Sequence, residues 1–293
     1  MTPRLSVGDT APLFTLPDAR GGDVTLDPSA APATVVVFTA NGCPYALAWH
    51  DRIQQVARDY AGQQVTVIQV VGNDETGHPE DSVASMRRRV ENGDIAGPYL
   101  RDADQEVVAA YGATATPEVF VLDRQGVVRY HGAPDANHDN PAENAQWARD
   151  ALDDVLAGKA VRRPRTSPVG CSTKWRVELL WWEGCPSHEG AFDLLSLTLA
   201  ELKRADVAVV RREVITADEA VRLNFPGSPT FQVGRRDLFP HDAAPALNCR
   251  VYRTPDGRLS PLPDAADLAA RLREALARPW DLPGWVDPRK ETS

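Results

Sequence analysis

The chain has 293 residues, of which 43% are hydrophobic and 25% charged, with a formal net charge of −9. This length suits two domains, and the acidic balance argues against a nucleic-acid or anionic membrane partner. No apolar run approaches the ~18 residues of a membrane span, and the first residues lack the apolar segment of a signal peptide. We therefore expect a cytoplasmic protein whose four cysteines are reactive, metal-binding or simply buried thiols.

Strand and helix patterns alternate through the first half of the chain. Buried strands are predicted over 34–39 and 65–71, and a hairpin over 119–130. Helices are predicted over 44–60, 82–90, 104–111 and 144–156, and a loop over 132–143. This alternation predicts an α/β fold in which a sheet with a parallel core carries helices on both faces.

The same alternation starts again after a stretch that is rich in proline and arginine. We interpret 161–174 as a linker that carries Cys171. Strands are predicted over 176–182, 207–215, 230–233 and 249–253, and helices over 187–204, 217–223 and 265–277. The predicted domains are therefore 1–160 and 175–280, followed by a tail over 281–293.

Each half contains a Gly-Cys-Pro turn between a predicted strand and a predicted helix. The sequence reads FTANGCPY around Cys43 and LWWEGCPSH around Cys185. Proline suits the first turn of a helix, and a cysteine at this place faces the free N–H groups and the dipole of the helix, which favour a thiolate. Both cysteines are candidate nucleophiles, and the competing interpretation is a buried structural cysteine.

Each turn also has a matching proline downstream. Thr116-Pro117 precedes the predicted strand EVFVLD, and Ser228-Pro229 precedes TFQV. A proline that opens a central strand favours a cis peptide bond, since the trans form would place the ring against the ladder. We predict two cis bonds, each in a loop that lies against the cysteine turn of its own half.

Both halves resemble thioredoxin-fold families. The opening VGDTAPLFTLPD, the FTANGCPY turn, the hairpin TPEVFVLDRQGVVRYHG and the later GCSTKW resemble the redoxin branch, which includes peroxiredoxin-like proteins. The second half, with GCP, SPT and a late Cys249, resembles a compact thioredoxin-like protein. The resemblance implies two thioredoxin-like folds in tandem, each a central mixed sheet flanked by helices.

The resemblance also implies an activity, that of a thiol–disulfide oxidoreductase without a cofactor. Its substrate would be a thiol or disulfide, protein or small molecule, and its reductant a small-molecule thiol or a thioredoxin-type protein. The residues Thr116, Pro117, Ser228 and Pro229 would contact the substrate, because such families present backbone groups there.

The sequence departs from these families at the motif itself. Neither turn keeps C-x-x-C, because Ala46 and His188 occupy the positions of the second cysteine. Ala40 stands where a peroxiredoxin has threonine. We therefore expect thiol–disulfide exchange, with thiols distant in sequence resolving the mixed disulfide, in preference to peroxidase activity.

The resemblance implies that Cys43 pairs with Cys171 and Cys185 with Cys249, since GCSTKW is similar to the tail of a redoxin domain. Four cysteines allow three complete pairings. Cys43–Cys249 with Cys171–Cys185 stays open, whereas Cys43–Cys185 with Cys171–Cys249 would block both turns. Cys249 could also be an ordinary core residue of its strand.

Two further side chains stand near the turns. His188 could stabilise the Cys185 thiolate or bind a metal with it, or it could be an exposed polar residue of the helix. Tyr45 could line the Cys43 pocket, and the other five histidines are interpreted as surface residues. Two alternative functions stay open: a protein that handles a soft metal or an organomercurial through thiolates, and a redox-silent binding module.

Overall fold

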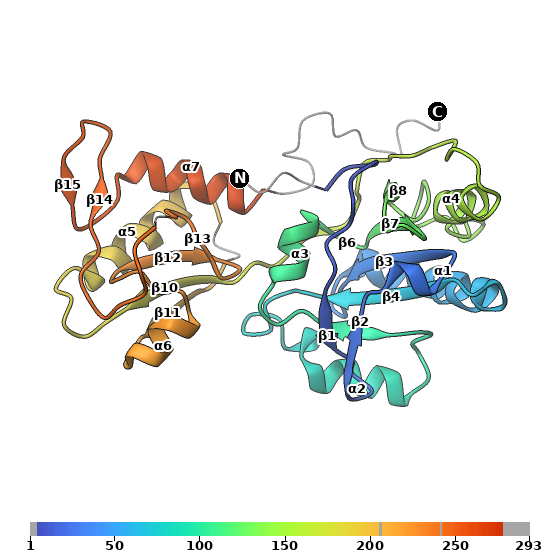
Figure 1. Ribbon diagram of the computed structural model, residues 1–293, viewed down its shortest axis with the longest axis horizontal. Helices are drawn as coiled ribbons and strands as arrows, with labels where there is room; N and C mark the ends of the chain where they lie inside the picture. Colours follow the sequence, from blue (N-terminus) through green and yellow to red (C-terminus); the bar gives the residue numbers. More distant parts are fainter. Residues whose placement is uncertain (1–4, 205–206, 241, 278–293) are drawn as a thin grey trace. The chain divides into compact units, whose positions relative to one another are not determined.

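The computed structural model describes residues 5–204, 207–240 and 242–277. The chain divides into two compact units, with unit 1 ending at Lys174 and unit 2 spanning Trp175–Ala277 (Figure 1). The predicted tail over 281–293 lies outside the described residues. No helix in the described ranges combines the length and apolar character that crossing a bilayer requires.

Unit 1 is built on a five-stranded sheet of order β5-β4-β3-β7-β8. The first three of these strands are parallel, and β7 and β8 complete the sheet in antiparallel pairings. All seven residues of β3 are buried, as expected for a strand that is covered on both faces. The strands are β3 (Ala33–Thr39), β4 (Thr66–Val71), β5 (Tyr99–Arg101), β7 (Glu118–Asp123) and β8 (Val128–Gly132).

Helices cover both faces of this sheet. They are α1 (Pro44–Tyr60), α2 (Val83–Glu91), α3 (Glu106–Tyr111) and α4 (Gln146–Leu156). Trp49 of α1 and Leu152 of α4 share one core with alternate residues of β3. On the other face the ring of Tyr111 packs against Phe38 and Phe120, with centroids 5.3 and 5.2 Å away. The period-two alternation of β3 therefore separates two cores.

Several very short elements complete unit 1. Strands β1 (Thr15–Pro17) and β2 (Asp23–Thr25) form a hairpin, and β6 (Ala115–Thr116) pairs with β9 (Cys171–Ser172) in antiparallel fashion. Turns of 3-10 helix lie at η1 (Pro28–Ala30), η2 (Ala61–Gln63) and η3 (Pro79–Asp81). Two or three residues carry no readable periodicity, so the sequence patterns did not predict these elements or β5.

The prediction that 161–174 forms a linker is wrong. The Thr166 N–H donates to the His131 carbonyl at 3.1 Å, and Arg165 forms a bridge with the same residue of β8. Cys171 and Ser172 then form β9. The extended backbone satisfies its hydrogen bonds against unit 1, so this stretch belongs to unit 1 and the boundary falls after Lys174.

Unit 2 has a four-stranded sheet of order β11-β10-β12-β13. The β10–β11 pair is parallel, whereas β10–β12 and β12–β13 are antiparallel. This is the order and direction of β4-β3-β7-β8 in unit 1, so both units have a thioredoxin-like fold. The strands are β10 (Val177–Trp181), β11 (Val209–Glu213), β12 (Thr230–Val233) and β13 (Arg236–Asp237).

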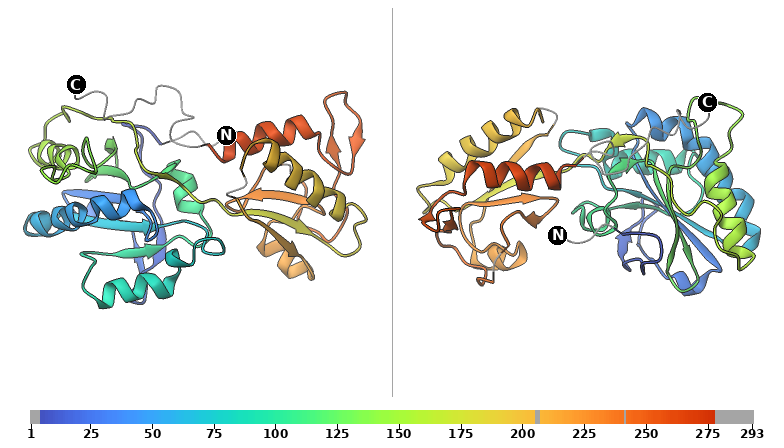
Figure 2. Two further views of the ribbon diagram at one scale, coloured as in Figure 1. Left: turned by 180° about the vertical axis from the view of Figure 1, so that it is seen from behind. Right: turned by 90° about the horizontal axis from the view of Figure 1, so that it is seen from above.

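Helices α5 (His188–Glu201) and α7 (Ala265–Ala275) lie side by side on one face of this sheet, and α6 (Ala217–Arg222) lies on the other (Figures 1 and 2). Leu195 of α5 and Leu268 of α7 are fully buried against Phe231 of β12. An amphipathic stripe on each of the two long helices therefore closes the unit 2 core.

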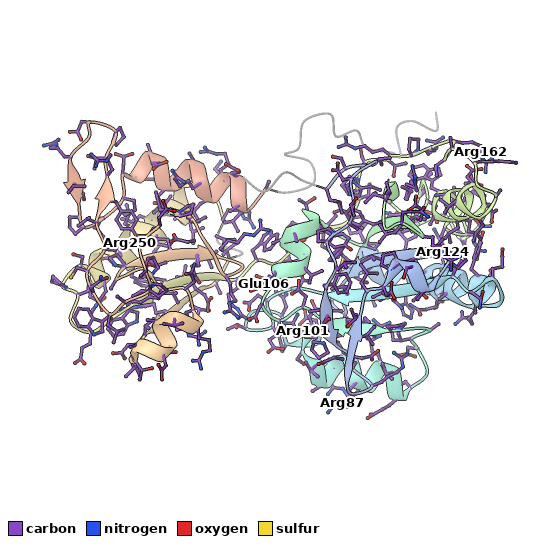
Figure 3. The ribbon with its side chains drawn as sticks, in the orientation of Figure 1. Arg87, Arg101, Glu106, Arg124, Arg162 and Arg250 are labelled. Atoms are coloured by element: carbon purple, nitrogen blue, oxygen red, sulfur yellow. The ribbon has the colours of Figure 1, made fainter. Side chains whose placement is uncertain are left out.

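The predicted strand over 249–253 forms only in part. Its last two residues form β14 (Tyr252–Arg253), which pairs with β15 (Leu259–Ser260) in a hairpin. Cys249 makes an isolated bridge with Ser228. Arg250, labelled in Figure 3, is buried and donates to Asp237 Oδ2 at 2.8 Å. This buried ion pair anchors the segment that carries Cys249.

Candidate functional site

Cys43 caps the N-terminus of α1. Its backbone is extended, Pro44 begins the helix, and the Ala46 N–H donates to the Cys43 Sγ at 3.4 Å. The side chain of this cysteine sits in the turn that follows β3, and the residue is only 4% exposed. The helix N-terminus thus faces the sulfur, as the Gly-Cys-Pro pattern predicts.

Buried polar groups fix the turn that precedes Cys43. The Asn41 N–H donates to Asp81, and the Asn41 side chain donates to the Glu80 carbonyl at 2.7 Å. Asp81 also accepts from the Asn73 amide at 2.8 Å, and burial raises the pKa of Asp81. These bonds hold the backbone of the turn in place.

A cis-proline loop lies against the cysteine turn of each unit. The Thr116–Pro117 and Ser228–Pro229 peptide bonds are both cis. The Cys43 thiol donates to the Thr116 carbonyl at 2.9 Å, and the Cys185 thiol donates to the Ser228 carbonyl at 3.3 Å. In both units the residue before the proline therefore touches the candidate nucleophile.

Cys171 reaches the same place from the far end of unit 1. It faces Thr116 across the β6–β9 ladder, and its side chain packs with Cys43 and Ala46. Tyr45 packs on the same cluster, and the two thiols lie close enough for each to shift the pKa of the other. Folding thus brings together two cysteines that are far apart in sequence.

The two sulfurs differ in acidity. A hydrogen bond from the Cys171 thiol, with smaller contributions from the Thr116 side chain and the Ala46 N–H, lowers the pKa of Cys43 to about 6 although burial opposes this. The pKa of Cys171 is raised, because its thiol donates to Cys43 and is partly buried. The Thr116 carbonyl holds the proton of the neutral Cys43 thiol and thus opposes ionisation. Near neutral pH, Cys43 is the thiolate and Cys171 keeps its proton.

We expect the alkylation rate of Cys43 to rise with a midpoint near pH 6, because only the thiolate reacts and the pKa of Cys43 is about 6. Cys171→Ala removes the main hydrogen-bond donor and should move this midpoint upward. The measurement is the iodoacetamide rate of the Cys43 peptide, followed by mass spectrometry across the pH range. A wild-type midpoint near ~8.5, the value of a free thiol, would contradict this assignment.

A buried acid and a buried histidine support the cis-proline loop of unit 1. Glu118 Oε2 accepts from the N–H groups of Thr114 and Ala115 at 2.8 and 3.0 Å, and Glu118 Oε1 pairs with His131 Nε2. The His131 ring stacks on Phe120 with centroids 4.2 Å apart. The prediction that this histidine lies at the surface is wrong. An acid inside the apolar run EVFVLD was the signal that could have revealed the pair.

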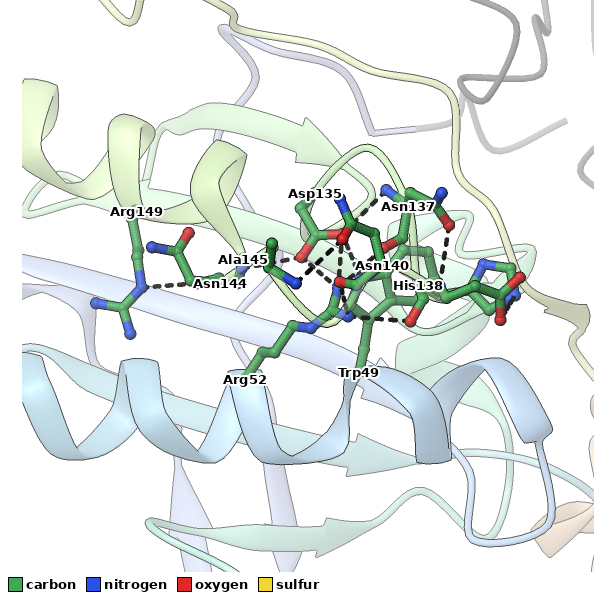
Figure 4. A network of polar contacts seen from close by, with 11 residues as sticks. Trp49, Arg52, Asp135, Asn137, His138, Asn140, Asn144, Ala145 and Arg149 are labelled. Atoms are coloured by element: carbon green, nitrogen blue, oxygen red, sulfur yellow. Dashed lines mark hydrogen bonds and ion pairs between the residues drawn. The ribbon is translucent and has the colours of Figure 1, made fainter. Parts of the chain in front are cut away.

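The loop over 132–143 is held on α1 by the buried carboxylate of Asp135 (Figure 4). Asp135 accepts from Trp49 Nε1 at 2.6 Å and from Arg52 Nη1 at 2.9 Å. The loop carries His138, whose ring packs on Tyr45 with centroids 4.5 Å apart. Tyr45 thus packs beside the two cysteines, and its ring contacts His138 of this loop.

Unit 2 repeats the arrangement around Ser228. Cys185 is 2% exposed, and the Trp182 N–H donates to the Ser228 hydroxyl at 3.1 Å. Cys249 is exposed and forms a backbone bridge with Ser228. Partial desolvation and the neighbouring Cys185 sulfur raise the pKa of Cys249. A second cysteine therefore stands beside each turn cysteine.

In unit 2 the helix starts further from the cysteine than in unit 1. Helix α5 begins at His188, so Cys185 lies in the preceding turn and does not cap the helix. The His188 ring packs on Trp181 with centroids 4.4 Å apart, and its Nε2 lies 3.4 Å from Glu189 Oε1. The predicted helical spacing between His188 and Cys185 is thus not realised. Within the described ranges, no group of three or more His, Cys, Asp or Glu side chains could hold a metal ion.

Residues 7–131 match the model of the AhpC/TSA family. The match is a similarity of this segment, which makes up less than half of the chain. The matched segment contains the Cys43 turn and the cis-proline loop, but it ends before Cys171 and does not include unit 2.

Individual relatives extend this result. A Mycobacterium tuberculosis H37Rv protein, provisionally named a peroxiredoxin, is 29% identical over 137 residues, which is 44% of this chain and 77% of the relative. The thiol:disulfide interchange protein DsbE of Allochromatium vinosum is 26% identical over 126 residues, 42% of this chain and 65% of the relative. The crystal structure of a hypothetical protein from Sinorhizobium meliloti 1021 matches with a TM-score of 0.55 and 35% identity, covering 59% of this chain and 96% of that one.

Proposed function

We propose that this protein is a thiol–disulfide oxidoreductase whose reacting groups in unit 1 are Cys43 and Cys171. One observation carries the proposal: the Cys171 side chain packs against Cys43 at the N-terminus of α1, where the pKa of Cys43 is lowered to about 6. The match of residues 7–131 to the AhpC/TSA family model and the name of the DsbE relative support a redox role.

The reaction begins with the Cys43 thiolate. It attacks one sulfur of a substrate disulfide, and the other sulfur leaves as a thiolate that takes a proton from water. Cys171 then loses its proton to water and attacks the Cys43 sulfur of the mixed disulfide. The bond between Cys43 and the substrate breaks, and the second substrate sulfur leaves as a thiolate that takes a proton from water. The substrate has gained two electrons, and the protein holds a Cys43–Cys171 disulfide, which a small-molecule thiol or a thioredoxin-type protein reduces.

We extend the proposal to Cys185 and Cys249 of unit 2, because both units place a second cysteine beside the residue before a cis-proline. Disulfide exchange is favoured over peroxide reduction, since Ala40 replaces the threonine that peroxiredoxins have three residues before the cysteine. The predicted cytoplasmic location stays a prediction.

We expect mild oxidation to link Cys43 to Cys171 and Cys185 to Cys249. The measurement is peptide mapping of protein purified under anaerobic alkylation, before and after oxidation, with Cys171→Ser as the matched control that must lose the Cys43 link. A link between the two units would overturn the pairing. A metal retained in the intact mass would favour soft-metal handling, and four unreactive thiols would favour a binding module.

A further inference from the structure

The backbone edge beside Cys43 is already occupied by the protein's own chain. Strand β6 pairs with β9, so that Thr116 faces Cys171. The Thr173 N–H donates to the Thr114 carbonyl at 3.0 Å. Hydrogen-bonded pairs recur every second residue of an antiparallel ladder, so Thr116 also stands at a hydrogen-bonded position. An extended peptide binds by adding a strand to a free edge, and this edge is not free.

The pairing is close and anchored at its end. A Cβ on Gly170 would lie 2.2 Å from the Thr116 carbonyl oxygen, so only glycine permits this approach. Beyond Cys171, the Thr173 hydroxyl donates to the Ala113 carbonyl at 3.2 Å. The Lys174 N–H donates to Asn73 Oδ1 at 2.9 Å. The Asn73 amide in turn donates to Asp81, the carboxylate that fixes the Cys43 turn.

Unit 2 shows the same occupation with different chain geometry. The Ser228 N–H donates to the Asn248 carbonyl at 2.8 Å, and the Arg250 N–H donates to the Ser228 carbonyl at 2.7 Å. Both backbone groups of Ser228 are thus used by the residues that flank Cys249. The two units thus share one arrangement although their connecting segments differ. In both, the turn cysteine has little exposed surface, 4% for Cys43 and 2% for Cys185.

We infer that the substrates are low-molecular-weight disulfides and thiols and that extended polypeptide strands are excluded, because the segments carrying Cys171 and Cys249 cover the backbone edges beside Cys43 and Cys185. This rests on the proposed function. A slender disulfide RSSR can reach a sulfur that has little exposed surface, whereas a peptide strand would first have to displace β9. The thiolate attack breaks the RSSR bond, and the two steps release two RSH for one protein disulfide. Two molecules of a low-molecular-weight thiol supply the two electrons that reduce the protein disulfide, and they leave as a disulfide.

The test compares two substrates of the full-length protein, bis(2-hydroxyethyl) disulfide and insulin. Each rate is divided by the rate of the uncatalysed reaction of the same substrate with dithiothreitol. We expect wild type to accelerate the small disulfide at least about tenfold more than insulin. Gly170→Ala should raise the ratio of the insulin acceleration to the small-disulfide acceleration about tenfold, because its Cβ pushes β9, and Cys171 with it, away from Thr116. Gly62→Ala is the matched control, since its Cβ meets open space, and should change neither rate.

Hydrogen exchange of wild type provides a second measurement that needs no variant. The Thr173 and Lys174 amides should be protected, and their exchange at the rate of an unfolded chain would show an open edge and overturn the inference. Equal acceleration of insulin and the small disulfide by wild type would also overturn it. If neither substrate reacts and no Cys43–Cys171 disulfide forms, the proposed function itself fails, and the inference falls with it.

Discussion

Cys43→Ser is expected to abolish disulfide reduction by unit 1. A serine hydroxyl is not ionised near neutral pH and is a poor nucleophile, whereas the pKa of Cys43 is about 6. We expect the rate to fall to that of the uncatalysed reaction, a loss of at least about 100-fold. The measurement is the reduction of bis(2-hydroxyethyl) disulfide with glutathione as the reductant.

Unit 2 would hide this loss if its own pair were active. The substitution is therefore made in a chain that already carries Cys185→Ser and Cys249→Ser, and that parent chain is the control. Circular dichroism and the thermal midpoint must match the parent, because Cys43 is buried against the Thr116 loop. A Cys43→Ser chain that folds and keeps the parent's rate would remove Cys43 from the reaction.

Asp135→Ala is expected to cause the largest loss of stability among the substitutions considered. The Asp135 carboxylate is fully buried and accepts from Trp49, Arg52 and the Ala145 N–H (Figure 4). Its removal leaves the mostly buried Arg52 guanidinium without its counter-charge, although loop carbonyls still accept from it. The N–H groups of Trp49, Asn137 and Ala145 lose their acceptor. Breaking one side of a buried ion pair costs about 3–5 kcal/mol in the free energy of unfolding.

Two units need not unfold in one step, so the measurement is the free energy of opening at the α1 amides by hydrogen exchange. Asp139→Ala is the matched control in the same loop. Its side chain is 74% exposed and its Oδ1 lies 3.2 Å from His138 Nε2, so the expected change is below about 1 kcal/mol. If both substitutions change the free energy of opening equally, Asp135 does not anchor the loop.

Local patterns in the sequence were enough to predict the two α/β folds and the two cysteine turns. Helix α1 begins and ends where its pattern predicts, at Pro44 and Tyr60. Its capping cysteine, its N1 proline and its apolar face all lie within a few residues of one another, so the sequence shows them directly. The same holds for β3, a β-branched run long enough to be recognised as a buried strand.

Only the tertiary structure decided what surrounds those turns. Strand β9 has two residues, and its partner strand β6 lies some fifty-five residues away in the chain. No local pattern encodes such a strand, because its stability comes from the ladder it completes and from the close approach that Gly170 permits. A proline- and arginine-rich composition predicted a linker there. The buried Glu118–His131 pair likewise depends on two strands meeting. The sequence by itself therefore determined the turn that holds each candidate nucleophile, while long-range backbone pairing decided which second thiol stands beside it.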